Sequence, residues 1–123
     1  MSYKHCEIYK QGCENSLFTQ VRVPQGFYHN AKGLLGEAQL KENTGMLFKR
    51  CSSIHMFGMK IPLDIIFLAS DGRIIKCVSG LQPWKVSGCL GSSMTLELPK
   101  GSIEKTGLKQ NMKLEIKECK NQE

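Results

Sequence analysis

The chain has 123 residues, of which 41% are hydrophobic and 23% are charged, and it carries a formal net charge of +6. This length corresponds to about one domain on the usual scale of roughly 100–200 residues per domain, and the composition argues against a disordered, collagen-like or coiled-coil chain. The positive charge is spread thinly, with Lys49-Arg50 as the only adjacent pair of Lys or Arg residues. Since nucleic-acid-binding domains gather such residues on one face, we expect no nucleic-acid partner.

The N-terminal third combines strand, turn and helix signals. Residues 1–16 predict an irregular segment or an edge strand, and residues 17–23 alternate in a way that indicates a half-buried strand ending at Pro24. Residues 26–30 predict a turn. Residues 31–40 carry an apolar stripe at helical spacing, with Asn30 as the N-cap, so we expect a helix there.

The middle of the chain has the strongest strand signal. Residues 61–68 are apolar on both faces except for Asp64, which predicts a strand buried from both sides, with Pro62 at its start. The dipeptide Asp71-Gly72 indicates a tight turn, so residues 73–79 should return as the second strand of a hairpin. Further strand signals lie at residues 46–48, 53–59, 94–98 and 112–116, and residues 102–106 predict one helical turn.

Together these elements predict a mainly β (α+β) fold. We expect a small antiparallel or mixed β-barrel-like sheet of six or seven short strands with one covering helix. Residues 17–118 are assigned to a single β-rich domain, with residues 1–16 before it and a frayed tail at residues 119–123.

The six cysteines show no Cys-x-x-Cys spacing, and the first residues show no secretory signal. We therefore expect a cytoplasmic protein with free thiols and no cofactor, present as a monomer or weak dimer. No apolar run is long enough to span a bilayer, so no membrane span is expected. Cys51 and Cys89 fall in expected loops, where each is either a reactive thiol or a partly buried one.

Several motifs follow one another along the chain: Lys32-Gly33-Leu34-Leu35-Gly36, His55-Met56-Phe57-Gly58-Met59-Lys60-Ile61-Pro62-Leu63-Asp64, Asp71-Gly72-Arg73-Ile74, Pro83-Trp84-Lys85 and Leu96-Glu97-Leu98-Pro99. In order and spacing they resemble domain-of-unknown-function family 192, a prokaryotic family, in its branch with a His-x-Phe-x-Met-basic-x-Pro-x-Asp motif. The resemblance covers about residues 17–117 and implies a compact β-rich domain. It also implies an association with secretion or pilus-assembly machinery, but it implies no mechanism for this protein.

The chain departs from this family pattern at two places. Gln110-Asn111 stands where Gly-Asp is common before the last strand, and Ala69-Ser70 stands where a small residue and Asp often precede the hairpin turn. An Asp with a function at the first of these places would be missing here.

Lys60 and Asp64 are candidate binding residues on the same face of the expected strand. Four residues of strand span roughly 13 Å, so a direct ion pair would need a bend, for example at Pro62. Asp64 is either a ligand-facing carboxylate or a carboxylate that holds a neighbouring turn through backbone N–H groups, and we favour the second interpretation.

His55 has soft-ligand neighbours, since Cys51 lies four residues before it and two methionines follow. A Cys-x-x-x-His pair supplies only two of the four ligands of a structural zinc site, so we assign no metal. Met56, Phe57 and Met59 are interpreted as core residues.

Trp84 is the only tryptophan, and it lies between Pro83 and Lys85 before a Gly/Ser-rich loop. A loop tryptophan anchors either the edge of the core or a partner, so Trp84 and Lys85 are the strongest candidates for a recognition surface.

We therefore expect a non-catalytic module that binds a small molecule or a protein through His55, Lys60, Asp64, Trp84 and Lys85. One alternative is a hydrolase-like enzyme with Asp64 or His55 as base and Lys60 as charge stabiliser. A second alternative is a metal-binding protein that uses Cys51 and His55.

Overall fold

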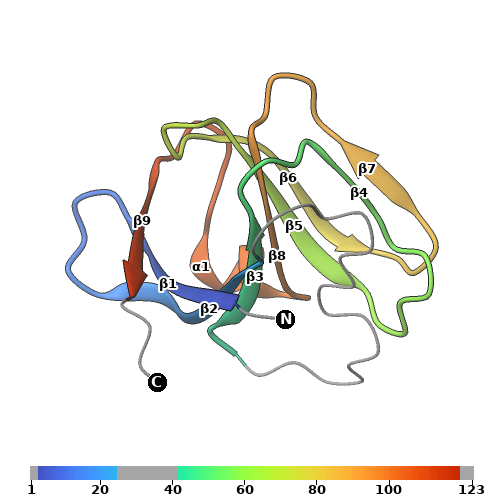
Figure 1. Ribbon diagram of the computed structural model, residues 1–123, viewed down its shortest axis with the longest axis horizontal. Helices are drawn as coiled ribbons and strands as arrows, with labels where there is room; N and C mark the ends of the chain where they lie inside the picture. The colour runs from blue at the N-terminus through green and yellow to red at the C-terminus, as the bar shows by residue number, and fades with distance from the viewer. Residues whose placement is uncertain (1–2, 25–41, 120–123) are drawn as a thin grey trace.

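Short strands make up most of the described chain, in line with the alternating pattern of the sequence. The computed structural model describes residues 3–24 and 42–119 (Figure 1). Its elements are β1 (Tyr3–Lys10), β2 (Ser16–Pro24), β3 (Thr44–Phe48), β4 (Ser53–His55), β5 (Leu63–Leu68), β6 (Ile74–Leu81), β7 (Val86–Gly88), β8 (Met94–Pro99), α1 (Ser102–Thr106) and β9 (Leu114–Cys119).

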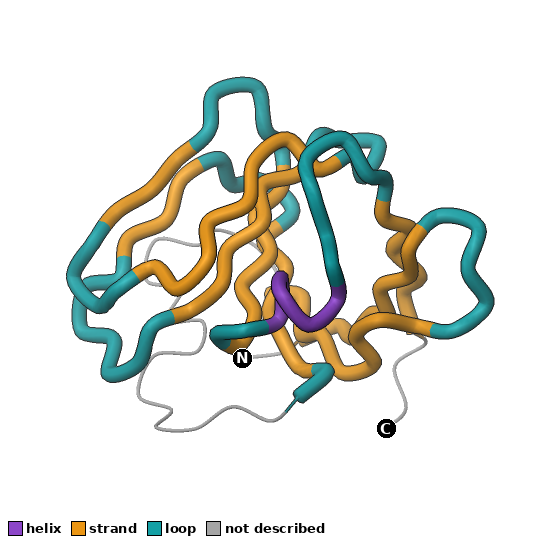
Figure 2. The backbone as a smooth tube through the Cα atoms, turned by 180° about the vertical axis from the view of Figure 1, so that it is seen from behind, coloured by secondary structure: helices purple, strands orange, loops and turns teal. Residues whose placement is uncertain are grey.

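Seven strands form one curled sheet in the order β6-β5-β8-β3-β2-β1-β9, and β4 pairs with β7 in a separate two-stranded sheet. All pairs in the large sheet are antiparallel except β2 with β3, which run parallel. Helix α1 lies in front of the strands when the molecule is seen from behind (Figure 2). This half-barrel with one short described helix confirms the predicted mainly β fold.

The structure confirms some of the predicted elements, corrects others and does not describe the rest. The helix expected at residues 31–40, its cap Asn30 and the turn before it lie outside the described residues. The helical turn expected at residues 102–106 is α1. The N-terminal segment contains β1, which lies between β2 and β9 rather than at an edge. The division into residues 1–16, 17–118 and 119–123 stays a prediction.

In the described ranges, no helix is long and apolar enough to cross a membrane.

The predicted hairpin of β5 and β6 is confirmed. All six residues of β5 are buried, and the strand pairs with β6 on one side and β8 on the other. At the turn, Asp71 Oδ1 accepts a hydrogen bond from the backbone N–H of Arg73 at 3.0 Å, and Gly72 has a φ of 93°. Such a left-handed conformation favours glycine.

Alternation along β5 divides the core into two clusters. Leu63, Ile65 and Phe67 pack in one cluster with the buried Met56 and Met59. Ile66 and Leu68 belong to the larger cluster, which also contains Ile103 of α1. Because successive side chains of a strand point to opposite faces, Asp64 shares the face of Ile66 and Leu68. The two faces of β5 therefore support two separate parts of the surface: α1 on one side, and the β4–β7 sheet on the other.

The hairpin turn also joins the far edge of the sheet. The backbone N–H of Leu114 donates to the carbonyl of Gly72 at 2.8 Å, and that of Ile74 donates to the carbonyl of Met112 at 2.7 Å. Asn111 has a φ of 76° and accepts a hydrogen bond from Arg73 Nη1 at 3.1 Å. These contacts bring the start of β6 to the segment that leads into β9, which makes the sheet barrel-like.

Replacement of Gly72 by alanine tests this junction. An added Cβ would lie 2.2 Å from the carbonyl oxygen of Leu114, so the backbone would have to separate. Gly12→Ala is the matched control, because Gly12 has a φ of 83° with no atom within 4 Å of the added Cβ. We expect the control to cost about 1–2 kcal/mol from backbone strain alone and Gly72→Ala to cost clearly more in urea unfolding. Equal losses would contradict the close approach.

Candidate functional site

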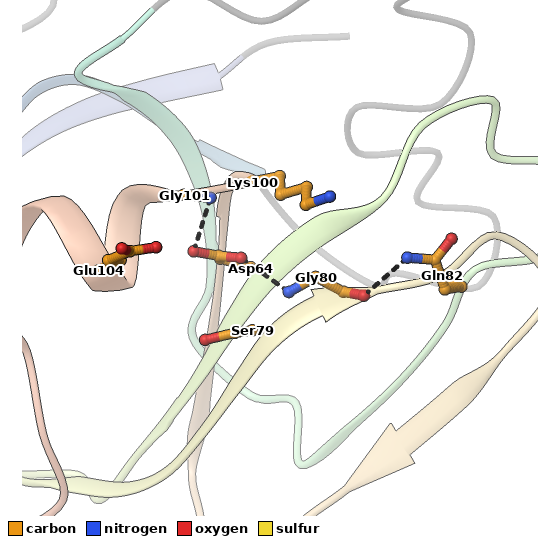
Figure 3. A pocket seen from close by; sticks show the side chains of 7 residues that line it. All are labelled: Asp64, Ser79, Gly80, Gln82, Lys100, Gly101 and Glu104. Atoms are coloured by element: carbon orange, nitrogen blue, oxygen red, sulfur yellow. Dashed lines mark hydrogen bonds between the residues drawn. The ribbon is translucent and has the colours of Figure 1, made fainter.

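Asp64 is a buried carboxylate whose two oxygens accept three backbone hydrogen bonds. Oδ1 accepts from the N–H of Gly80 at 2.8 Å, and Oδ2 accepts from the N–H groups of Gly101 at 3.1 Å and Ile103 at 2.9 Å. Figure 3 shows the carboxylate between the end of β6 and the start of α1. The side chain thus connects three segments that are far apart in the sequence.

The local backbone explains why these N–H groups are available. The pairing of β5 with β6 is irregular between Leu63 and Ile65, opposite Gly80, whose φ is 62°. Such a bulge leaves an N–H outside the ladder. Helix α1 begins after Gly101, which has no side chain to act as an N-cap, so the carboxylate from β5 takes over that role.

The energies favour a structural role for this carboxylate. Burying an ionised carboxylate costs several kcal/mol, and hydrogen bonds to charged groups return about 1.5–3 kcal/mol each. The three bonds of Asp64 are enough to offset the burial. This geometry agrees with the interpretation, favoured from the sequence, of a carboxylate that holds neighbouring turns.

An open pocket of about 310 Å³ lies over this connection. Besides Asp64, it is lined by Ser79, Gly80, Gln82, Lys100, Gly101 and Glu104. Of the five predicted site residues, only Asp64 lines this pocket. The volume is at the lower end of the roughly 300–1,000 Å³ of small-molecule sites, and apart from its glycines the pocket is lined by residues with polar or charged side chains.

A second candidate region is formed by two tight turns beside the β4–β7 sheet. In the first, the N–H of Met59 donates to the carbonyl of Met56 at 3.2 Å, with Gly58 at a φ of 80°. In the second, the N–H of Lys85 donates to the carbonyl of Gln82 at 3.2 Å, with Trp84 at a φ of 69°. A positive φ at the third residue is the mark of a type II turn.

Met56 joins these two turns through its backbone. Its N–H donates to the carbonyl of Lys85 at 2.7 Å, and its carbonyl accepts from the N–H of Trp84 at 2.7 Å. Its side chain is fully buried in the cluster with Phe67. The turns are therefore fixed to each other and to the core.

Three aromatic rings follow one another on the surface of this region, and we call His55, Phe57 and Trp84 the aromatic row. The ring centroids of His55 and Phe57 are 4.6 Å apart, and those of Phe57 and Trp84 are 5.9 Å apart in a stacked arrangement. Trp84 is nevertheless 65% exposed. The third residue of a type II turn is normally glycine, so a bulky residue there carries backbone strain of the kind that gathers at functional sites.

The predicted site residues thus fall into two groups. The structure brings His55, Trp84 and Lys85 together, and Lys60 is exposed after the first turn. Asp64 is buried on the opposite, α1-facing side of β5. The sequence analysis placed Asp64 in one site with the other four residues, but Asp64 lies on the opposite face of β5.

Three further surface residues were missed. Phe57 was interpreted as core, but it is half-exposed, whereas Met56 and Met59 are buried as expected. Val86 and Leu90 are 64% and 100% exposed. The Gly58 that follows Phe57 was the available signal, since glycine favours turns and turns usually run over the surface.

The thiols do not form a site in the described chain. Cys6, Cys13, Cys51, Cys77 and Cys89 are free. The Cys51 thiol donates to the carbonyl of Ser53, and Nδ1 of His55 accepts from the N–H of Phe57 at 3.3 Å. Within residues 3–24 and 42–119, no three His, Cys, Asp or Glu side chains are grouped to hold a metal ion.

Comparisons with known proteins identify relatives of the fold. A model of the DUF192 family, described as an uncharacterized ACR, matches residues 10–116. No curated protein matches the chain. A proposed transcription regulator from Sinorhizobium meliloti has a similar structure, with 23% identity, a TM-score of 0.77 and coverage of 94% of both chains. A protein of unknown function from Novosphingobium aromaticivorans has 24% identity and a TM-score of 0.76, over 92% of this chain and 84% of that chain. At these identities the likeness shows the fold alone.

The structural role of Asp64 is tested by Asp64→Asn. The amide would place a donor against backbone donors and remove the charge, so we expect a loss of about 2–4 kcal/mol in urea unfolding. The control Asp71→Asn keeps the Oδ1 that accepts from Arg73 at an exposed turn and should cost less than about 0.5 kcal/mol. The interpretation fails if Asp64→Asn is as mild as the control.

The environment of Cys77 gives a prediction about thiol reactivity. Burial raises the pKa of the Cys77 thiol, and the negative charge of Asp64 raises it further. Because the thiolate is the reactive form, Cys77 should be alkylated by iodoacetamide more slowly than the exposed Cys13 at neutral and mildly alkaline pH. Site-resolved mass spectrometry measures both rates, and a faster Cys77 would contradict this environment.

Proposed function

This chain belongs to the DUF192 family, and we propose that it acts as a non-catalytic binding module that recognises another protein through the aromatic row. The family description assigns no activity, so the proposal depends on the surface itself. The single observation that carries it is Trp84, a bulky side chain held exposed in a strained turn.

Three properties of the surface support a protein partner. Phe57, Trp84 and Val86 expose large apolar side chains on the two turns and the adjoining strand β7, and Leu90 is exposed in the loop after β7. Such clusters on soluble proteins mark interaction sites. Tryptophan is the residue type most enriched among those that dominate binding energy in interfaces. The rings are also preorganised, since backbone hydrogen bonds of Met56 fix both turns, which reduces the entropy lost on binding.

The alternatives receive less support from the geometry. A hydrolase that used Asp64 as base would need a carboxylate that a substrate can reach, but Asp64 is buried and three of its roughly four lone-pair sites accept backbone N–H groups. A metal-binding role would need ligands beyond Cys51 and His55. A small-ligand role would use the polar pocket beside Asp64, away from the exposed rings.

The proposal keeps the remaining expectations from the sequence. The module would act in the cytoplasm as a monomer or weak dimer, without a nucleic-acid partner. The resemblance to its family makes a component of secretion or pilus-assembly machinery one source of the partner protein.

The variant Trp84→Gly separates function from stability. Glycine relieves about 1–2 kcal/mol of strain and removes a ring contact of about 0.5–1.5 kcal/mol, so the free energy of unfolding should stay within about 1 kcal/mol of the wild type. Binding should instead fall at least roughly 30-fold, which corresponds to a loss of about 2 kcal/mol at a central anchor.

Binding is measured by affinity capture from a lysate of the source cells, followed by titration of the purified partner. Lys10→Ala is the control, because Lys10 is exposed at the end of β1. Equal binding of the partner by Trp84→Gly would show that Trp84 is not the anchor, and a large loss of stability in that variant would show that the side chain is structural. Either result would overturn the proposal.

A further inference from the structure

The segments that carry the aromatic row contain basic residues and no acidic ones. Residues 49–62 and 81–96 include Lys49, Arg50, Lys60 and Lys85, with neither Asp nor Glu. Lys49 pairs with Glu118, whereas Arg50, Lys60 and Lys85 are exposed. Lys85 directly follows Trp84, and Lys60 directly follows the turn that carries Phe57.

The described carboxylates lie elsewhere. Asp64 and Glu97 are buried, and Glu104 lies on α1 at the polar pocket. Glu115 and Glu118 are on β9, which lies on the side of the molecule opposite β4 and β7 (Figure 1). Among the described residues, the segments that carry the aromatic row thus contribute cations and no acidic side chain, and Glu118 of β9 pairs only with Lys49 at the start of the first segment.

The kind of partner follows from combining this charge with the exposed apolar groups. Aromatic rings with cations also suit single-stranded nucleic acid, whose bases stack on rings. Val86, on β7 next to the turn of Trp84, is aliphatic, however, and offers no such stacking. Aromatic anchors and aliphatic side chains with charges at the rim are the composition of protein interfaces.

We infer that the partner presents an acidic segment whose apolar side chains pack on the aromatic row while its carboxylates face Lys60 and Lys85. This inference rests on the proposed function and names the chemical class of its partner. Complementary charge of this kind accelerates association and selects among partners, and salt screens it.

The test is a display selection of random linear peptides against immobilised wild-type protein. Peptides that bind should be enriched in Asp and Glu beside at least one aromatic or aliphatic residue. Their affinity should fall as salt is raised, and Trp84→Gly should abolish binding. The double variant Lys60→Glu/Lys85→Glu should weaken binding by about tenfold or more.

A matched control distinguishes the charge beside the aromatic row from the net charge of the protein. The double variant Lys10→Glu/Lys117→Glu changes the net charge of the protein by the same amount as Lys60→Glu/Lys85→Glu. Because Lys10 lies on β1 and Lys117 on β9, this control should leave peptide affinity unchanged. Equal weakening by both double variants would reduce the effect to net charge and overturn the inference.

Other outcomes separate the inference from the proposed function. Peptides that require Trp84 but show no acidic enrichment would overturn the inference and leave the proposed function standing. The absence of any peptide that depends on Trp84 would overturn both. Binding of oligothymidylate that depends on Trp84, without peptide binding, would also overturn both.

Discussion

Burial of β5 on both faces is the constraint on which the rest of the molecule depends. Because side chains alternate along the strand, one face supports the cluster under the β4–β7 sheet and the other supports the larger cluster and α1. Asp64 occupies the second face and could not stay there as a charge without the three N–H groups that it accepts. The same strand therefore carries the polar connection to α1 and the apolar support of the turns that hold the aromatic row.

The aromatic row is held by backbone geometry rather than by burial of its rings. Both turns have a positive φ at their third residue, at Gly58 and at Trp84, and Met56 ties them together by two hydrogen bonds of 2.7 Å. A protein selected for stability alone would place glycine at both positions. Retaining an exposed tryptophan in such a turn costs stability, and stability given up locally is a common feature of functional sites.

The sequence predicted those features that depend on local patterns. Alternation and double burial identified the β5–β6 hairpin, and Asp71-Gly72 identified its turn, because both signals lie within a few residues. The sequence also favoured a backbone-binding role for Asp64. It could not identify the N–H groups of Gly101 and Ile103, which come close only through the sheet topology. Phe57 was assigned to the core because the sequence shows that the residue is hydrophobic. The sequence does not show where its side chain points, which depends on the turn at Gly58.

The central claim, that Trp84 is exposed and yet rigidly held, is tested most directly by time-resolved fluorescence of this residue, the only tryptophan of the chain. The indole should emit as a solvent-exposed group and be readily quenched by acrylamide, because the side chain is 65% exposed. Its anisotropy should decay with the rotation of the whole protein, because the turn and the stacked ring of Phe57 immobilise it. A blue-shifted emission that resists quenching, or a fast local decay of the anisotropy, would contradict the account.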